Sequence, residues 1–197
     1  MAKDGSAPSA LEAALLKAVE KTFTSRYGGN FEEPPVTKRE DIITWYKKMK
    51  IFGWEKFHSP TYILIIYFYE DKAAMEKQDP VGDIIFYIER KSAYSILKSI
   101  GIEATDEGVD YDELESAGDK ALADRCGELA KAAAEDIKTE LASLGHPQMH
   151  MSDPVSFINE VPDGIPYNHQ VLQKIELFCK IGEKKEEVVV FDIVFPE

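Results

Sequence analysis

Cysteine and long apolar runs are both scarce in this chain of 197 residues. Its two cysteines, Cys126 and Cys179, are too few for a disulfide framework, so we expect buried thiols in a reducing compartment. The most apolar stretch, residues 62–69, is much too short to cross a bilayer. No apolar segment follows the first residues, which argues against a signal peptide. These features predict a cytoplasmic protein without a membrane span.

Positive charge is scarce as well. The chain has 23 Lys and Arg against 36 Asp and Glu, which gives a net charge of −13. Such a surface repels a phosphate backbone, so we do not expect nucleic acid as a ligand. The acidity suits a partner with a basic face, but solubility alone also explains it.

Motifs for nucleophilic or nucleotide chemistry are missing too. There is no Gly-x-Ser-x-Gly element, and the glycines within residues 27–30 lack the spacing and the lysine of a phosphate-binding loop. Cys126 falls on an apolar helical stripe, which predicts an inert thiol. His58 and His169 have no evident acid–base partner in the sequence. A small-molecule enzyme is therefore not supported.

Metal-ligand patterns are incomplete. His146 and His150 have the i, i+4 spacing of a helical zinc pair, but Gly145 and Pro147 interrupt any helix there. The acids at positions 106–113 lack the alternation and the terminal Glu of an EF-hand loop. We therefore expect neither a metal nor a cofactor on this chain.

Helical periodicity appears in three places. Residues 9–12 form a capping box before a helix that should end at the glycines 28–29, and the small, polar residues 1–8 should be disordered. A short helix is predicted over residues 91–101. A long helix is predicted over residues 110–144, with a capping box at its start and a glycine after its end.

The rest of the chain is predicted to be mostly strand. Residues 60–70 and 81–89, joined by a charged turn over 72–80, should form an antiparallel pair. Residues 31–39, with their prolines, indicate a linker, and residues 42–49 fit either a short helix or a strand. Later strands are predicted over residues 155–161, 174–181 and 187–195. This order of elements is an α+β pattern.

The long helix should have an apolar face on the sheet and a charged face toward solvent. Its apolar stripe consists of Leu114, Ala117, Ala121, Leu122, Cys126, Leu129, Ala133, Ile137, Leu141 and Leu144. The opposite face carries Asp124, Glu128, Lys131, Glu135 and Lys138. Pairs such as Glu128 with Lys131 and Lys131 with Glu135 stabilise a helix by about 0.2–0.5 kcal/mol and need no function.

The order of the elements resembles the CheC/CheX family of chemotaxis phosphatases, most closely over residues 81–195. The resemblance depends on residues 82–97, on 126–138 as the family's long helix, and on the Ser-x-Pro segment within 151–158. It implies one domain over residues 1–197, with an antiparallel sheet and two long helices packed on one face. It also implies removal of phosphate from the aspartyl phosphate of a CheY-like response regulator, which itself supplies the Mg²⁺.

In that family a Glu-x-x-Asn motif on the long helix enters the regulator, and its Asn orients the attacking water. Glu128 matches the Glu, but Lys131 stands at the Asn position, and an ammonium offers no hydrogen-bond acceptor. The nearest asparagines, Asn159 and Asn168, lie outside the helix. We therefore predict that Asp124, Glu128, Lys131 and Glu135 bind a regulator, with weak or absent phosphatase activity. The alternative is a non-catalytic module for dimerisation or assembly.

Overall fold

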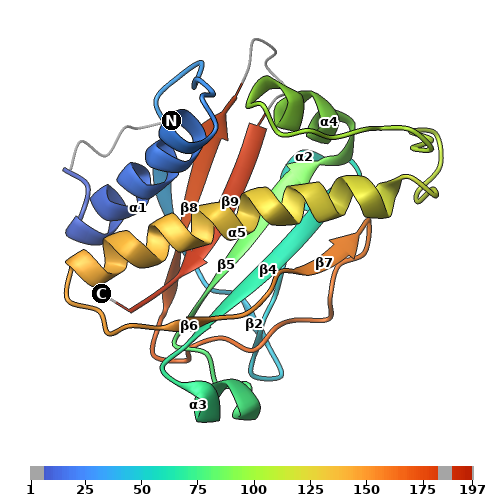
Figure 1. Ribbon diagram of the computed structural model, residues 1–197. Coiled ribbons are helices and arrows are strands. Elements are labelled where there is room, and N and C mark those ends of the chain that lie inside the picture. The colour runs from blue at the N-terminus through green and yellow to red at the C-terminus, as the bar shows by residue number, and fades with distance from the viewer. Residues whose placement is uncertain (1–6, 182–187, 197) are drawn as a thin grey trace.

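Antiparallel strands form one seven-stranded sheet at the centre of the molecule (Figure 1). The computed structural model describes residues 7–181 and 188–196, except for the side chains of residues 54 and 55. In chain order the strands are β1 (Val36–Asp41), β2 (Thr44–Trp45), β3 (Lys48–Met49), β4 (Thr61–Tyr69), β5 (Gly82–Glu89), β6 (His150–Met151), β7 (Val155–Ile158), β8 (Gln173–Lys180) and β9 (Val188–Val194). The sheet order is β1-β8-β9-β5-β4-β6, β7 also pairs with β4, and β2 and β3 form a separate hairpin.

Helices cover one face of this sheet. They are α1 (Ala10–Glu20), its π-helical continuation η1 (Lys21–Arg26), α4 (Arg90–Ser99) and α5 (Asp119–Ser143), as Figure 1 shows. Short helices α2 (Trp54–Phe57) and α3 (Lys72–Lys77) lie in connections. The predicted α+β architecture with helices on one face of an antiparallel sheet is confirmed.

The first helix begins where the capping box predicts. The backbone N–H of Ser9 donates to Glu12 Oε2 at 2.7 Å, and Ser9 Oγ accepts from the Glu12 N–H at 3.2 Å. The helix ends before Gly28, whose φ of +70° allows the chain to reverse. Of the segment predicted to be disordered, residues 1–6 lie outside the described residues.

Strand side chains alternate between two cores. On β4, Tyr62 and Leu64 pack under the helices, while Ile63 and Ile65 pack on the other face. The predicted pairing with β5 is confirmed, with Tyr62 opposite Ile88. The predicted charged turn between these strands contains the short helix α3. The later strands are found as β7, β8 and β9, although residue 187 lies outside the described residues.

Helix α5 begins later than predicted, because a buried arginine holds residues 110–116 in a loop. Arg90 is 1% exposed, and its guanidinium donates to the backbone carbonyls of Asp110 and Glu113 and to both carboxylate oxygens of Asp119. The capping-box prediction at 110–113 is therefore wrong. Leu114, predicted to lie on the apolar stripe, is 63% exposed in that loop.

Asp119 is thus the buried start of α5. Tyr62 and Ser116 also donate to its carboxylate. Burial alone would raise the pKa of this carboxyl, but hydrogen bonds from Arg90, Tyr62 and Ser116 outweigh burial and lower its pKa to about 2. The group stays ionised and fixes the first turn of α5 to β4 and α4.

Two segments whose structure the sequence left open or concealed lie at the sheet edge and on the sheet face opposite the long helices. Residues 31–39, predicted as a linker, contain part of β1, which pairs with β8 at the sheet edge. The exposed charges of β1, such as Lys38 and Arg39, are typical of an edge strand, and they conceal the alternation of apolar and polar residues that identifies a strand in a sequence. Residues 42–49 form the β2–β3 hairpin, so the strand alternative is correct. Met49 anchors this hairpin, at 2% exposure.

The structure also bears on the predictions about the two cysteines and about membrane spans. Cys126 and Cys179 are free and fully buried, as predicted. Burial raises the pKa of both thiols, so both remain protonated and unreactive near neutral pH. Among the helices of residues 7–181 and 188–196, none is long and apolar enough to cross a bilayer.

Candidate partner-binding face of helix α5

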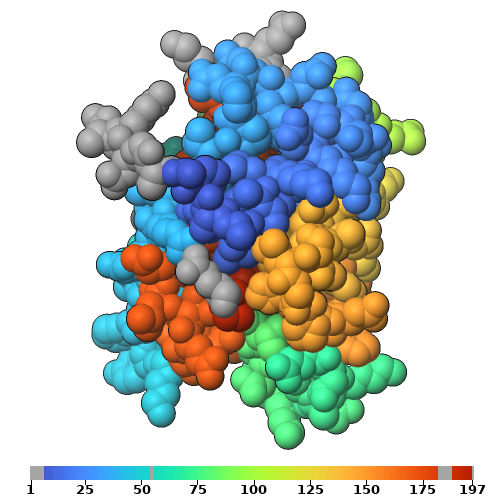
Figure 2. Space-filling view, turned by 90° about the vertical axis from the view of Figure 1, so that its left-hand side faces the viewer, coloured from blue at the N-terminus to red at the C-terminus, as the bar shows by residue number. Residues whose placement is uncertain are grey.

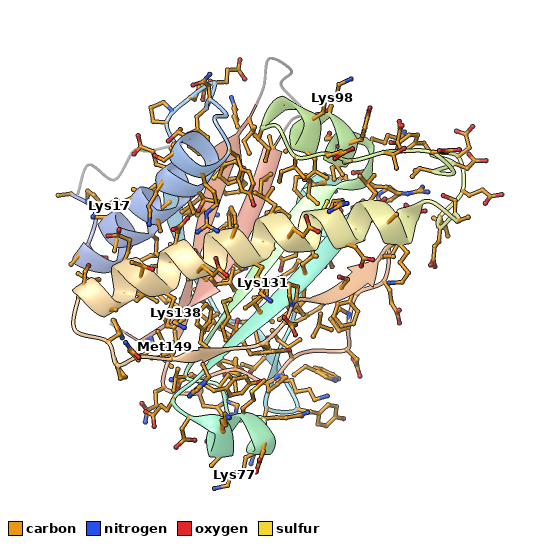
Figure 3. All side chains as sticks on the ribbon, in the orientation of Figure 1. Lys17, Lys77, Lys98, Lys131, Lys138 and Met149 are labelled. Atoms are coloured by element: carbon orange, nitrogen blue, oxygen red, sulfur yellow. The ribbon has the colours of Figure 1, made fainter. Side chains whose placement is uncertain are left out.

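The charged face predicted from the sequence is present on α5. Leu122, Cys126, Leu129, Ala133 and Ile137 lie buried against the sheet and the neighbouring helices. This packing directs the opposite face to solvent, where Asp124, Glu128 and Glu135 are exposed and Lys131 is half-buried. Figure 3 shows Lys131 and Lys138 on the side of α5 toward the segment that follows the helix, which Met149 marks.

That following segment lies against α5 at a glycine. An added Cβ at Gly127 would lie 3.4 Å from Leu64 Cδ2 and 3.8 Å from Pro154 Cβ, so the small residue lets strand, helix and loop meet. Ser152 is tied to β4 twice, because its N–H donates to the Tyr67 carbonyl and its Oγ accepts from the Tyr67 N–H. The Ser-Asp-Pro segment is therefore held rigidly beside the exposed face.

Asp153, between these two fixed residues, forms an ion pair with Lys131. The Lys131 Nζ lies 2.6 Å from Asp153 Oδ1; the Lys131 side chain is half-buried and that of Asp153 is largely exposed. This hydrogen bond raises the pKa of the Lys131 amine and lowers that of the Asp153 carboxyl. Sequence analysis identified both segments, but nothing in it indicated that these two side chains, 22 positions apart, form an ion pair.

The other charges on this face also have partners, but not those predicted from the sequence. Glu128 accepts from Arg125 Nη1 at 2.7 Å, an i, i+3 pair within α5, and not from Lys131. Glu135 accepts from Arg26 Nη1 of η1 at 3.0 Å. Asp124 pairs with Lys120 at 3.3 Å, one turn earlier on α5. The predicted pairs Glu128–Lys131 and Lys131–Glu135 are therefore replaced by one other pair within α5 and by pairs with flanking segments.

A polar seam joins α5 to α1 and η1 next to this face. Asp136, only 3% exposed, accepts from Thr22 at 2.9 Å and pairs with Lys21 at 2.8 Å. Glu140 pairs with Lys17, also at 2.8 Å. Sequence analysis missed this seam, because Asp136 and Glu140 lie on no apolar or exposed stripe. The seam fixes the rotation of α5 and with it the direction of its exposed charges.

The chemistry that this face offers is limited. Its side chains are carboxylates, guanidinium groups and ammonium groups, and neither α5 nor α1 with η1 contains an Asn or Gln. Asn159 follows β7, and the amide of Asn168 donates to the Val81 carbonyl at 3.0 Å, so neither belongs to α5. Within the described part of the chain, no His, Cys, Asp and Glu side chains gather into a group that would hold a metal.

Comparison with known proteins connects this geometry to one fold. No family model matches the sequence, and no curated protein matches it either. A CheC-like superfamily protein from Shewanella sp. PV-4 superimposes with a TM-score of 0.56 at 15% identity, over 97% of this chain and 100% of its own. CheX from Borrelia burgdorferi, solved in a complex with CheY, BeF3 and Mg²⁺, gives 0.57 at 12% identity, over 94% and 97%. A chain of a FliM–SpeE complex from H. pylori gives 0.50 at 10% identity, over 94% and 84%.

These likenesses establish that the chain has the CheC/CheX fold, so the resemblance inferred from the sequence is confirmed at the level of the fold. At such identities the fold is all that is shared. What the exposed face of α5 does must therefore be argued from its own residues.

Proposed function

We propose that this protein is a chemotaxis or two-component signalling protein that docks a CheY-like response regulator through the exposed face of α5. The observation that carries the proposal is Glu128. In the sequence it matches the glutamate of the family's motif, and its side chain on α5 is 57% exposed. The flanking residues Asp124, Lys131 and Glu135 complete a surface of three carboxylates and one ammonium group. The CheX of similar fold was solved with CheY, which supports this choice of partner.

We expect little or no phosphatase activity from this face. An aspartyl phosphate is already reactive, so a catalyst mainly has to position a water. Lys131 stands where an amide would orient that water, and Asp153 holds its pKa above the ordinary value. The amine therefore stays protonated and has no lone pair to accept a hydrogen bond. In the complex Lys131 would contact the phosphoryl group only as a positive charge.

The binding test uses the purified chain and the CheY-like regulators of the same organism, with Mg²⁺ and with beryllofluoride to mimic the aspartyl phosphate. We expect one regulator to bind more tightly in the activated form, and Glu128→Ala to weaken that binding about tenfold. Glu20→Ala, an exposed change on α1, is the matched control and should leave binding unchanged. If no regulator binds, or if Glu128→Ala binds as well as the parent chain, the docking proposal is wrong.

The catalytic test measures phosphate release from the regulator that binds. We expect the phosphorylated regulator to decay at nearly the same rate with and without this chain. Lys131→Asn creates the Glu-x-x-Asn motif and releases Asp153, so it should accelerate decay about tenfold. Lys131→Ala also releases Asp153 but supplies no amide, so it should leave the rate unchanged. Rapid decay with the parent chain would show that Lys131 does not block catalysis.

A non-catalytic assembly module is the second candidate. It is favoured by the exposed outer edge of β1, where Val36 is 59% exposed, because an unpaired edge can add a strand from another copy. A chain of similar fold also occurs in the FliM–SpeE complex. Size-exclusion chromatography with light scattering, with and without a regulator, distinguishes the candidates. A dimer that binds none of the regulators would favour the assembly module. We place either function in the cytoplasm.

A further inference from the structure

An aromatic hairpin stands on the face of the sheet opposite the long helices. In the β2–β3 hairpin Trp45 is 60% exposed and Tyr46 is 86% exposed, and their rings meet edge to face with centroids 5.0 Å apart. The base of the hairpin is fixed, because Met49 is buried and exchanges two backbone hydrogen bonds with Ile165, at 2.9 and 3.0 Å. These contacts therefore fix the position of the aromatic tip of the hairpin.

The turn at this tip is strained by its own residues. Tyr46 has a φ of +48° and Lys47 a φ of +63°, the left-handed region in which Asn and Gly are favoured in two-residue hairpin turns. A bulky side chain there costs stability and is typical of a functional site. An Asn-Gly pair would give a more stable turn, so folding alone does not explain Tyr46 and Lys47.

The same hairpin concentrates positive charge on an acidic protein. Lys47, Lys48 and Lys50 lie within four positions of a chain whose net charge is −13. Among the carboxylates that the structure describes, none lies within ion-pair distance of these three lysines. Lys50 Nζ does lie 5.3 Å from the centroid of the Phe52 ring. The hairpin and Lys50 are thus a local basic site with no carboxylate partner among the described residues.

A groove of about 620 Å³ runs beside the hairpin. Its lining is mainly apolar and includes Ile43, Trp45, Ile51, Val161 and Pro162. Lys50 and Asp163 supply the charged part of the lining. A groove of this size admits one large apolar side chain with its neighbouring backbone.

We propose that this groove binds an extended acidic segment of a partner protein, which inserts a large apolar side chain beside Trp45 while its carboxylates meet Lys47, Lys48 and Lys50. The charge of the hairpin complements such a segment, and the concave apolar lining fits its side chain. A nucleic acid or an anionic bilayer extends beyond this small patch and would meet the repulsion of the −13 chain around it, whereas a short acidic segment stays within the patch.

This surface is separate from the α5 face. In Figure 2 the cyan segment that carries the hairpin lies at the left, and the yellow-to-orange α5 lies at the right. Met49 of the hairpin packs in one core and the buried residues of α5 in the other, on the opposite face of the sheet. The groove proposal does not depend on regulator docking, so either can fail without the other. If both hold, the chain joins two partners on opposite faces.

The test selects peptides from a random library displayed on phage against the immobilised full-length chain, with Trp45→Ala as the counter-selection. We expect enriched peptides to carry a large apolar residue flanked by Asp and Glu. Fluorescence anisotropy with a labelled enriched peptide should show that Trp45→Ala weakens binding about tenfold or more, and Lys48→Glu about three- to tenfold. Lys98→Glu, an exposed reversal on α4, should bind like the parent chain.

Several outcomes would overturn the proposal. One is no enrichment, or enrichment of basic peptides. Another is binding that Trp45→Ala leaves intact in a variant whose thermal unfolding matches the parent chain. Tighter binding to phosphatidylserine vesicles or to oligothymidylate than to the enriched peptide would assign the hairpin to a membrane or a nucleic acid. A dimer that Trp45→Ala dissociates would assign the groove to a second copy.

Discussion

The two faces of the sheet are covered by different kinds of structure. Under the helices the core is almost entirely apolar, with the ion pair of Arg90 and Asp119 at its margin. On the other face, loops and a hairpin cover the sheet, and a cluster of charges lies within it. Lys174 is 2.7 Å from Asp192, and Lys56 is 2.9 Å from the same carboxylate. Glu176 pairs with Lys56, and Tyr87 donates to Asp192 at 2.9 Å.

The difference follows from what each cover can supply. A helix satisfies its own backbone and offers an apolar stripe, so strands beneath it can be wholly apolar. Loops, the hairpin and the short α2 offer fewer apolar side chains, and here Lys56 of α2 and Lys174 of β8 itself pair with a buried carboxylate. The packing of the helical face is therefore determined by the periodicity of apolar residues, and that of the opposite face by specific ion pairs between buried side chains. The predictions below remove these pairs, from the most enclosed to the most exposed.

Asp119→Ala should have the largest effect. It would leave the Arg90 guanidinium, 1% exposed, without a counter-ion under the helices. Removing one partner of a buried pair costs about 3–5 kcal/mol in the free energy of unfolding. Urea denaturation followed by circular dichroism measures it. Lys120→Ala, the next residue on α5, is the control and should cost no more than about 0.5 kcal/mol. Equal losses in the two variants would contradict the anchoring role of Asp119.

Asp192→Ala tests the loop face and should cost less, about 2–3 kcal/mol. Lys56 would keep Glu176 as a partner, and Lys174 would keep Glu40 at 3.4 Å. The same denaturation experiment applies, with the exposed Asp41→Ala on β1 as a control of small effect. A loss as large as that of Asp119→Ala would show that these remaining partners do not compensate.

The same contrast explains what the sequence predicts. Helix periodicity and capping residues identified α1, α4 and most of α5, because each helix buries one continuous stripe. Lys174 and Glu176 alternate with apolar residues on β8 and read as solvent-facing, yet each is 5% exposed. Whether an alternating charge meets water or a loop is decided by segments distant in the chain. The α5 face followed from the pattern, whereas its partners Arg26 and Asp153 did not, for the same reason.

Asp83→Asn should have a smaller effect of opposite sign. Asp83 is buried on β5, and its carboxylate oxygens have no hydrogen-bond partner among the described residues. Burial, and then the nearby Asp192, raise its pKa well above that of an unfolded chain, about 3.9. The folded state holds this proton more tightly, so stability is lost as pH rises above about 4. The amide stays neutral and removes that loss.

The measurement is unfolding of Asp83→Asn and the parent chain from pH 4 to pH 8. We expect the variant to gain about 1–2 kcal/mol over the parent near pH 7, with the gain shrinking toward pH 4. Asp79→Asn, an exposed change in the preceding loop, should show no such trend. A variant that is less stable at every pH would mean that the carboxylate has a stabilising partner.

Arg125→Ala and Glu128→Ala should have the smallest effect, because their side chains are 47% and 57% exposed. A double-mutant cycle by urea denaturation should give a coupling below about 0.5 kcal/mol, which added salt reduces further. A coupling above about 1 kcal/mol would instead give the pair a structural role. The small value matters for function: Glu128 can then be removed without unfolding α5, so any loss of regulator binding would report on the contact itself. The buried ion pairs stabilise the fold, so the exposed charges of α5 are available to bind a partner.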